Sequence, residues 1–157
     1  MIFLNKEIEL IVSDFDGVMT DNTFTLDENG IESVRLSRAD GLAVGLFKNA
    51  GLRFMLLSSE KNPIVEKRAN KLKIDVIFGT DNKLDALLEY CTKNEYSLDN
   101  VLYIGNDLND LEVMKKVGVS VSVNDAADSI KSKADLVLKT NGGKGAIREL
   151  YKRMVGN

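Results

Sequence analysis

Short runs of apolar residues alternate along this chain with longer segments whose apolar positions recur every three to four residues. The apolar runs predict buried strands at 8–13, 53–57, 76–78, 101–104, 119–123 and 136–138. The segments between them predict helices at 42–50, 63–72, 83–93, 108–117, 126–130 and 146–154. This alternation is typical of a parallel sheet covered by helices. We therefore expect an α/β fold, a three-layer doubly wound parallel sheet, in a single domain spanning residues 1–157.

One segment departs from this alternation. Residues 22–36 alternate apolar and polar side chains on both sides of Asn29 and Gly30, a dipeptide that favours tight turns. This pattern predicts a β-hairpin inserted directly after the first strand.

Turn-forming residues mark three helix boundaries in the predicted fold. Asn62 followed by Pro63 is typical of a helix start, because proline fits the first helical position. Gly51 and Gly118 each follow a helical segment, and we expect both to end a helix.

The amino-acid composition excludes several kinds of catalytic and metal site but says little about the fold. The chain has 21 Lys and Arg against 24 Asp and Glu, and it has no histidine. The lack of histidine excludes Ser-His-Asp and Cys-His catalysis and every zinc site with histidine ligands. The single cysteine, Cys91, lies in a predicted helix without a cationic neighbour, which favours a buried, unreactive thiol. The mixed charge predicts no nucleic-acid surface, and the lack of a long apolar run predicts a cytoplasmic protein without a membrane span.

The first predicted strand ends in two aspartates. Ligands of an open parallel sheet bind beyond the carboxyl ends of its strands, and Asp14 and Asp16 lie at such an end. Two carboxylates this close raise each other's pKa unless a cation neutralises them. Mg²⁺ suits the pair, because it prefers oxygen ligands and keeps several waters. A solvated acidic turn is the alternative, whereas a calcium loop is excluded because its final glutamate is missing.

Polar side chains also follow the next three strands. They are Ser58 and Ser59, then Lys83 at a helix start, then Asn106, Asp107, Asn109 and Asp110. Hydroxyl groups and turn amides can bind phosphate oxygens. By themselves, the lysine could be an exposed helix residue and the acids could cap a helix.

In order along the chain, these residues resemble the four motifs of the haloacid dehalogenase superfamily of phosphatases. The matching segments are Asp14-x-Asp16-Gly-Val-x-Thr20, a hydroxyl after the second strand, a lysine, and Gly-Asn106-Asp107-x-x-Asp110. The resemblance covers essentially the whole chain. It implies a Rossmann-like fold and a phosphoric monoester hydrolase that requires Mg²⁺.

The resemblance also implies a role for each of these side chains. Asp14 would attack phosphorus and form an aspartyl-phosphate, and Asp16 would act as general acid and base. The implied phosphate ligands are Ser58, Ser59, Lys83 and Asn109, and the implied metal ligands are Asp14, Asp16, Asn106, Asp107 and Asp110. Such chemistry needs no histidine, because phosphoryl transfer depends on positioning and charge neutralisation.

The chain departs from the superfamily pattern at Asn106, where an aspartate on the metal is usual. Asparagine can still ligate Mg²⁺ with one charge fewer. Alternatively, Asp107 binds the metal in place of Asn106. A third possibility is that the enzyme has weakened activity.

The size and the hairpin resemble the capless, homotetrameric sugar-acid phosphatases of this superfamily. In them the hairpin and the C-terminal tail of one subunit approach a neighbour's active site, and segments 37–42 and 142–149 agree with that subfamily. The glycine-rich stretch 142–145 lacks the pattern of a nucleotide phosphate loop.

The substrate prediction depends on the residues after the second strand. Octulosonate 8-phosphate phosphatases tend to have Thr-Gly-Arg there, whereas this chain has Ser58-Ser59-Glu60. This favours a nonulosonate (sialic-acid-type) 9-phosphate, with Glu60 accepting hydroxyl hydrogen bonds and with Arg68, Lys71 and Ser37 as further substrate contacts. Arg68 and Lys71 share a helix face on which they could meet a sugar carboxylate, and a solvated face is the alternative.

Three other functions stay open at this point. The first is a 3-deoxy-D-manno-octulosonate 8-phosphate phosphatase, which Glu60 disfavours. The second is a non-catalytic domain associated with acylneuraminate cytidylyltransferase, which Asn106 keeps open. The third is a signalling receiver domain, which the hairpin and the order of the acidic strand ends disfavour.

Overall fold

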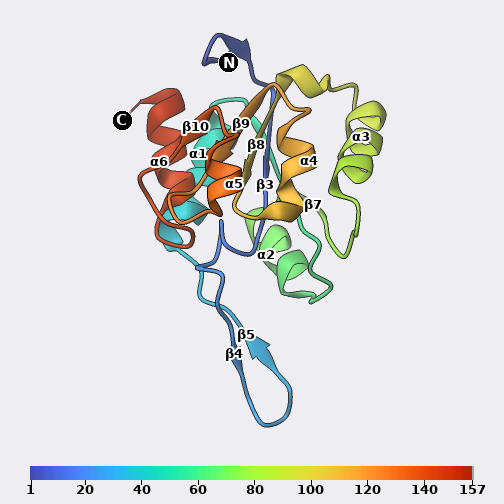
Figure 1. Cartoon of the computed structure of the whole chain (residues 1–157), viewed down its shortest axis with the longest axis vertical. Helices are drawn as coiled ribbons and strands as arrows, with labels where there is room; N and C mark the ends of the chain where they lie inside the picture. Colours follow the sequence, from blue (N-terminus) through green and yellow to red (C-terminus); the bar gives the residue numbers. More distant parts are fainter. Residues whose placement is uncertain (157) are drawn as a thin grey trace.

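A six-stranded parallel sheet forms the centre of the computed structural model, which describes residues 1–156 (Figure 1). In chain order its strands are β3 (Leu10–Ser13), β6 (Arg53–Leu57), β7 (Asp75–Ile77), β8 (Val101–Gly105), β9 (Val119–Ser122) and β10 (Leu136–Val137). Their spatial order is β10-β9-β8-β3-β6-β7. The chain thus winds outward from β3 in one direction and from β8 in the other, which confirms the predicted doubly wound fold.

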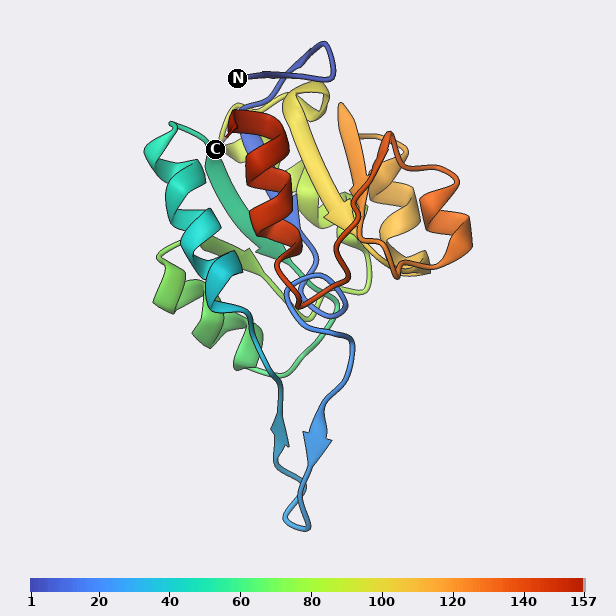
Figure 2. The same cartoon turned by 90° about the vertical axis from the view of Figure 1, so that its left-hand side faces the viewer.

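Helices cover both faces of the sheet (Figure 2). On one face lie α1 (Arg38–Asn49), α2 (Ile64–Leu72) and α6 (Ala146–Val155), and on the other lie α3 (Lys83–Lys93), α4 (Leu111–Met114) and α5 (Asp128–Lys131). Every residue of β3 and β8 is buried between these layers, which is why both strands have nearly continuous apolar sequences. Within residues 1–156, no helix combines the length and the apolar composition that crossing a membrane requires.

The core contains Cys91, as the sequence predicts. The side chain is buried among the apolar residues of the α3 face, and burial raises the pKa of its thiol to about 11. A thiol with that pKa is almost entirely protonated at neutral pH and is a poor nucleophile.

Two predicted helices have different ends in the structure. The first begins at Arg38, four residues before the predicted start, because the Ser37 hydroxyl accepts a hydrogen bond from the Asp40 amide (3.3 Å) and caps it. The helix predicted at 108–117 is instead a 3₁₀ turn, η2 (Leu108–Asp110), followed by α4, which ends at Met114.

The prediction that Gly118 ends a helix is wrong. Its backbone does not have a positive φ, and it lies beyond the end of α4. A Cβ at this position would overlap the carbonyl group of Asp99, which precedes β8. Close backbone approach, rather than helix capping, therefore requires glycine here.

The first predicted strand begins at Leu10 rather than at residue 8. The residues before it form a two-stranded antiparallel ribbon, β1 (Ile2–Phe3) and β2 (Lys6–Glu7). Leu4 and Asn5 turn between these strands with φ of 49° and 61°. Asparagine tolerates this left-handed conformation but leucine rarely adopts it, so the local sequence gives only a weak turn signal.

The hairpin predicted at 22–36 is present and projects away from the body of the molecule (Figure 1). Its paired strands are β4 (Thr25–Leu26) and β5 (Glu32–Ser33), joined by a turn in which Gly30 has a φ of 76°. The Asp27 carboxylate stabilises this turn by accepting hydrogen bonds from the amides of Asn29 (2.9 Å) and Ile31 (2.8 Å).

Candidate active site

The carboxyl ends of β3, β6 and β8 form a cleft of about 440 Å³. Its position is the topological switch point of the sheet, because β3 pairs with β6 on one side and with β8 on the other. The cleft is lined by ten residues: Asp14, Asp16, Asn22, Ser58, Ser59, Glu60, Asn106, Asp107, Leu108 and Asn109. The structure thus brings most of the predicted site residues together.

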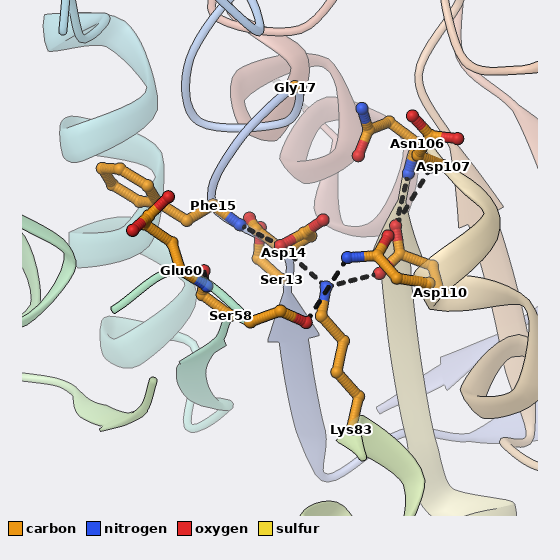
Figure 3. A network of polar contacts seen from close by, with 12 residues as sticks. Ser13, Asp14, Phe15, Gly17, Ser58, Glu60, Lys83, Asn106, Asp107 and Asp110 are labelled. Atoms are coloured by element: carbon orange, nitrogen blue, oxygen red, sulfur yellow. Dashed lines mark hydrogen bonds and ion pairs between the residues drawn. The ribbon is translucent and has the colours of Figure 1, made fainter. Parts of the chain in front are cut away.

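Lys83 lies beneath the cleft between two carboxylates (Figure 3). Its Nζ is 2.9 Å from Asp14 Oδ1 and 2.7 Å from Asp110 Oδ1, and the residue is only 3 % exposed. Burial lowers the pKa of this ammonium, but the charges of Asp14 and Asp110 outweigh burial and raise it. Lys83 is therefore held as a buried cation at the first position of α3, where the Asn82 side chain caps the helix.

Asp14 follows β3 directly and is almost fully buried. Its Oδ1 accepts a hydrogen bond from the Phe15 amide (2.7 Å) in addition to the contact with Lys83. Burial, followed by the charge of Asp110, raises the pKa of Asp14 to about 8, although Lys83 opposes this rise. A cation at the second carboxylate oxygen would favour the ionised form, which a nucleophile requires.

Three oxygen atoms converge at the cleft floor beside Asp14. Asn106 Oδ1 lies 3.0 Å from the Asp16 backbone carbonyl oxygen and 3.2 Å from Asp14 Oδ2. Oxygens bound at neighbouring positions of Mg²⁺ are separated by about 2.8 to 3.0 Å, because Mg–O distances are about 2.0 to 2.1 Å in an octahedron. The residues therefore fit Mg²⁺ in number, type and spacing.

The Asn106 amide can face these two oxygens with either its oxygen or its nitrogen. With Oδ1 facing the other two oxygens, three acceptors point at one another and need a cation between them. With the amide reversed, Nδ2 would donate hydrogen bonds to Asp16 O and Asp14 Oδ2. Asparagine can therefore hold the loop together without a metal and ligate the metal when it binds.

Asp110 and Asp107 each make other contacts, although Asp107 also lines the cleft. Asp110 is fully buried, and its Oδ2 accepts hydrogen bonds from the amides of Asn106 (2.8 Å) and Asp107 (3.2 Å) while its Oδ1 contacts Lys83. Asp107 is exposed and accepts from the Leu108 amide (2.7 Å). Among residues 1–156, no three acidic or cysteine side chains form a metal-binding group, which is consistent with a site built from one carboxylate, one carbonyl and one amide.

Asp16 faces the cleft with an environment suited to proton transfer. Burial raises the pKa of its carboxyl group, and the negative charge of Glu60 raises it further, while Lys83 and a hydrogen bond with Thr20 oppose the rise. A carboxyl group with a raised pKa can donate a proton at neutral pH and later accept one.

Comparison with known proteins identifies the family. A family model of haloacid dehalogenase-like hydrolases matches residues 55–150. The chain belongs to this family.

Individual members of the family resemble the chain along most of its length. The 3-deoxy-D-manno-octulosonate 8-phosphate phosphatase of Escherichia coli K12 is 34% identical over 146 residues, which make up 92% of this chain and 78% of the relative. A solved phosphatase of the same name from Yersinia pestis is 33% identical with a TM-score of 0.90, and the match covers 93% of this chain and 80% of that chain.

A third similar protein was solved with ligands. The 3-deoxy-D-manno-octulosonate 8-phosphate phosphatase of Moraxella catarrhalis, in complex with a magnesium ion, a phosphate ion and a KDO molecule, is 30% identical with a TM-score of 0.90. The match covers 94% of this chain and 85% of that chain. The similarities confirm that this hydrolase is a phosphoric monoester hydrolase of the sugar-acid phosphatase group and that its cofactor is Mg²⁺.

Two further residues of the hydrolase support the site, of which only Thr20 lies in one of the sequence motifs. Tyr103 is buried in β8, and its hydroxyl donates to Asp110 Oδ1 (2.6 Å). Thr20 is buried at the end of the first motif, and its Oγ1 accepts from the amides of Gly17 (3.1 Å) and Asn22 (3.2 Å). The only sequence signal for Tyr103 is one hydroxyl-bearing residue in an otherwise aliphatic strand end.

Three predicted substrate contacts lie outside the cleft. Arg68 Nη2 donates to the Ser37 carbonyl (3.3 Å) and packs against Gly41 of α1. The Ser37 hydroxyl caps α1, and Lys71 is an exposed residue of α2. The structure therefore does not bring these three residues to the site, because the face of α2 that carries Arg68 packs against α1.

A second cleft of about 260 Å³ adjoins the first and shares Asp16, Asn22 and Glu60 with it. It lies between the base of the hairpin and the start of α2, where Asn62 Nδ2 donates to Glu32 Oε2 (3.3 Å). Carboxylates, amides and Thr23 supply its polar lining, and neither cleft is lined by a lysine or an arginine of the described residues.

Proposed function

We propose that the protein is a Mg²⁺-dependent phosphatase that hydrolyses a 3-deoxy-ulosonate phosphate through an aspartyl-phosphate on Asp14. The observation that carries this proposal is that the two oxygen atoms of the Asp14 carboxylate make different contacts. Oδ1 contacts Lys83 at 2.9 Å, and Oδ2 lies 3.2 Å from Asn106 Oδ1, which in turn lies 3.0 Å from the Asp16 carbonyl oxygen. The carboxylate is thereby held between a fixed cation and a site for a second one.

The residues of the chain account for both halves of the reaction. Asp14 attacks phosphorus, and Asp16 donates a proton to the departing alkoxide. Asp16 then takes a proton from the water that hydrolyses the aspartyl-phosphate. Lys83 and Ser58 stabilise the charge on the phosphoryl oxygens, and bound Mg²⁺ supplies further neutralisation of that charge.

The first candidate substrate is 3-deoxy-D-manno-octulosonate 8-phosphate. Curated relatives 34% identical over 92% of this chain have this substrate in their names. The placement of Arg68 and Lys71 outside the cleft removes one reason for preferring a nine-carbon acid.

A nonulosonate 9-phosphate is the second candidate, and Glu60 is the observation that favours it. Glu60 lines both clefts, so a longer sugar chain that extends from the first cleft into the second would pass it. Its carboxylate could accept hydrogen bonds from the additional hydroxyl groups.

The proposed substrates carry a carboxylate, for which neither cleft offers a cationic side chain. We infer that the protein assembles, as a homotetramer, so that the hairpin and C-terminal tail of one subunit approach the neighbouring cleft. Exposed apolar residues on the hairpin support this assembly, with Phe24 58% exposed and Ile31 64% exposed. Light scattering at micromolar concentration should give a mass well above 17.4 kDa, and a monomer would contradict the shared site.

A substrate panel tests the proposed function. Purified protein with Mg²⁺ should release inorganic phosphate from eight-carbon or nine-carbon ulosonate phosphates at a kcat/KM well above that for simple sugar phosphates. EDTA should abolish the release and added Mg²⁺ should restore it. Release from no member of the panel would favour the non-catalytic alternative.

A further inference from the structure

Loop 141–145 packs against residues 17–21, which follow Asp14 and Asp16 in the chain. Figure 2 shows the two loops side by side below α6. The Gly143 amide donates to the Val18 carbonyl (2.9 Å), and Lys144 Nζ lies 3.5 Å from Asp21 Oδ2. The sequence resembles no nucleotide-binding loop, and the structure instead places it against the segment that follows Asp14 and Asp16.

Gly142 makes the closest approach between the two loops. A Cβ at this position would overlap the carbonyl oxygen of Gly17 and lie 2.9 Å from the Thr20 carbonyl oxygen. The backbone of Gly142 does not have a positive φ, so its own conformation does not require glycine. The contact with Gly17 is therefore the reason why no side chain fits there.

Gly17 in turn packs against the proposed metal ligands. Its φ is 82°, and a Cβ on it would overlap the amide group of Asn106. The Asp16 carbonyl, which is one of the three converging oxygens, belongs to the peptide that joins Asp16 to Gly17. A shift of Gly17 would therefore displace the Asp16 carbonyl and press on the Asn106 side chain.

We propose that Gly142 is a positioning residue of the metal site, which acts on Gly17 and through Gly17 on Asn106 and the Asp16 carbonyl. This inference rests on the metal site of the proposed function and adds a determinant of its affinity. Groups that orient metal ligands from outside the coordination sphere commonly change metal affinity by about 10-fold to 100-fold when they are altered.

The loop is anchored from its other side. Asp125 Oδ1 accepts a hydrogen bond from the Gly142 amide (2.9 Å), and Glu149 accepts from the amides of Lys139 (3.0 Å) and Thr140 (2.8 Å). These anchors hold Gly142 against Gly17, so Asp125 offers a way to loosen the loop without introducing a clash.

The test measures Mg²⁺ affinity without relying on catalysis. The chelator-treated protein is titrated with MgCl₂, and the thermal unfolding midpoint gives the dissociation constant, because a ligand of the native state raises the midpoint. Gly142→Ala should weaken Mg²⁺ binding about tenfold or more. Its kcat should recover at saturating Mg²⁺, which a general loss of folded protein would not allow.

Gly145→Ala is the matched control in the same loop. Gly145 has a φ of 103°, and a Cβ there meets no atom within 4 Å. This variant strains the loop without pressing on Gly17, so it should lower the midpoint while Mg²⁺ affinity stays at the parent value. Unchanged affinity in Gly142→Ala, or an equal loss in Gly145→Ala, would overturn the inference.

If Gly142→Ala fails to fold, Asp125→Ala tests the same inference. The side chain is exposed, so its removal should preserve the fold, and it should weaken Mg²⁺ binding several-fold. Affinity equal to that of the parent would overturn the inference. A parent protein that shows no Mg²⁺ binding would contradict the proposed function itself, which separates the two failures.

Discussion

The inner and outer parts of the cleft are built on opposite principles. At the inner end, Asp14, Lys83, Asp110 and Tyr103 are buried and joined by contacts of 2.6 to 2.9 Å. At the outer end, Glu32 and Glu60 are exposed, Asn62 is half-buried, and a hydrogen bond of 3.3 Å links Glu32 of the hairpin to Asn62 just before α2. The buried inner end carries the residues of the proposed chemistry, whereas the exposed outer end is where the proposed substrates would place their leaving group.

Asp14→Asn should have the largest effect on activity. The amide cannot attack phosphorus, so kcat should fall on the order of 10³-fold or more at saturating Mg²⁺. Phosphate release on the best substrate measures this, with Lys115→Met, at an exposed residue outside both clefts, as the control. A rate within tenfold of the parent would contradict the role of Asp14.

The same variant tests the pKa of Asp14 through stability. A carboxyl group with a folded-state pKa of about 8 against a usual 3.8 stabilises the protein below pH 4, and this stabilisation is lost as pH rises toward 8. Without Mg²⁺, the parent should therefore lose stability across that range. Asp14→Asn should show a flatter profile in urea unfolding between pH 5 and pH 8, and an equally steep profile would contradict the raised pKa.

Lys83→Met should damage both folding and catalysis. It leaves Asp14 and Asp110 buried without their shared cation, and removing one partner of a buried ion pair costs about 3 to 5 kcal/mol. Urea unfolding at pH 7.5 measures the loss. Lys115→Met, which removes an exposed partner of Glu112, is the control and should cost at most about 1 kcal/mol.

Tyr103→Phe should have an intermediate effect. It removes the hydroxyl that donates to Asp110 Oδ1, which is a hydrogen bond to a charged acceptor worth about 1.5 to 3 kcal/mol. The free energy of unfolding should fall by about that amount, and kcat should fall several-fold because Lys83 loses a fixed partner. No change in either quantity would show that Lys83 and Asp110 hold their positions without the hydroxyl.

Glu60→Arg should have the smallest effect on stability, within about 0.5 kcal/mol, because the side chain is exposed. Its effect should appear as selectivity, with the ratio of kcat/KM for eight-carbon over nine-carbon substrates rising by about tenfold, a change of about 1.4 kcal/mol in relative transition-state binding. Glu60→Gln separates the charge from the size of the side chain. An unchanged ratio in both variants would show that the outer cleft does not select through Glu60.

The same contrast explains how much of the molecule could be predicted from its sequence. The strands of the sheet and the helix that begins at Lys83 follow from apolar periodicity, because burial between two layers demands it. The inner residues follow from their spacing at strand ends. Tyr103 could not be predicted in the same way, because its hydroxyl role depends on Asp110, seven residues away and in another element.

The outer contacts were harder to predict because helix periodicity fixes a face but not its neighbour. Arg68 and Lys71 share a face of α2, yet the Arg68 guanidinium packs against α1 and donates to the Ser37 carbonyl. The close contact between Gly142 and Gly17 likewise joins residues 125 positions apart, and no local sequence pattern predicts it. Tertiary contacts of this kind determine which polar residues reach the cleft.

The central claim is that Asp14 forms a covalent intermediate that Asp16 helps to hydrolyse. Rapid mixing of Asp16→Asn with p-nitrophenyl phosphate and Mg²⁺ tests it directly, because this leaving group departs without an acid while the second step still needs a base. We predict a burst of one p-nitrophenolate per subunit, slow turnover, and a phosphoryl group on Asp14 detected by mass spectrometry. Turnover without a burst, or a phosphoryl group on another residue, would contradict the account.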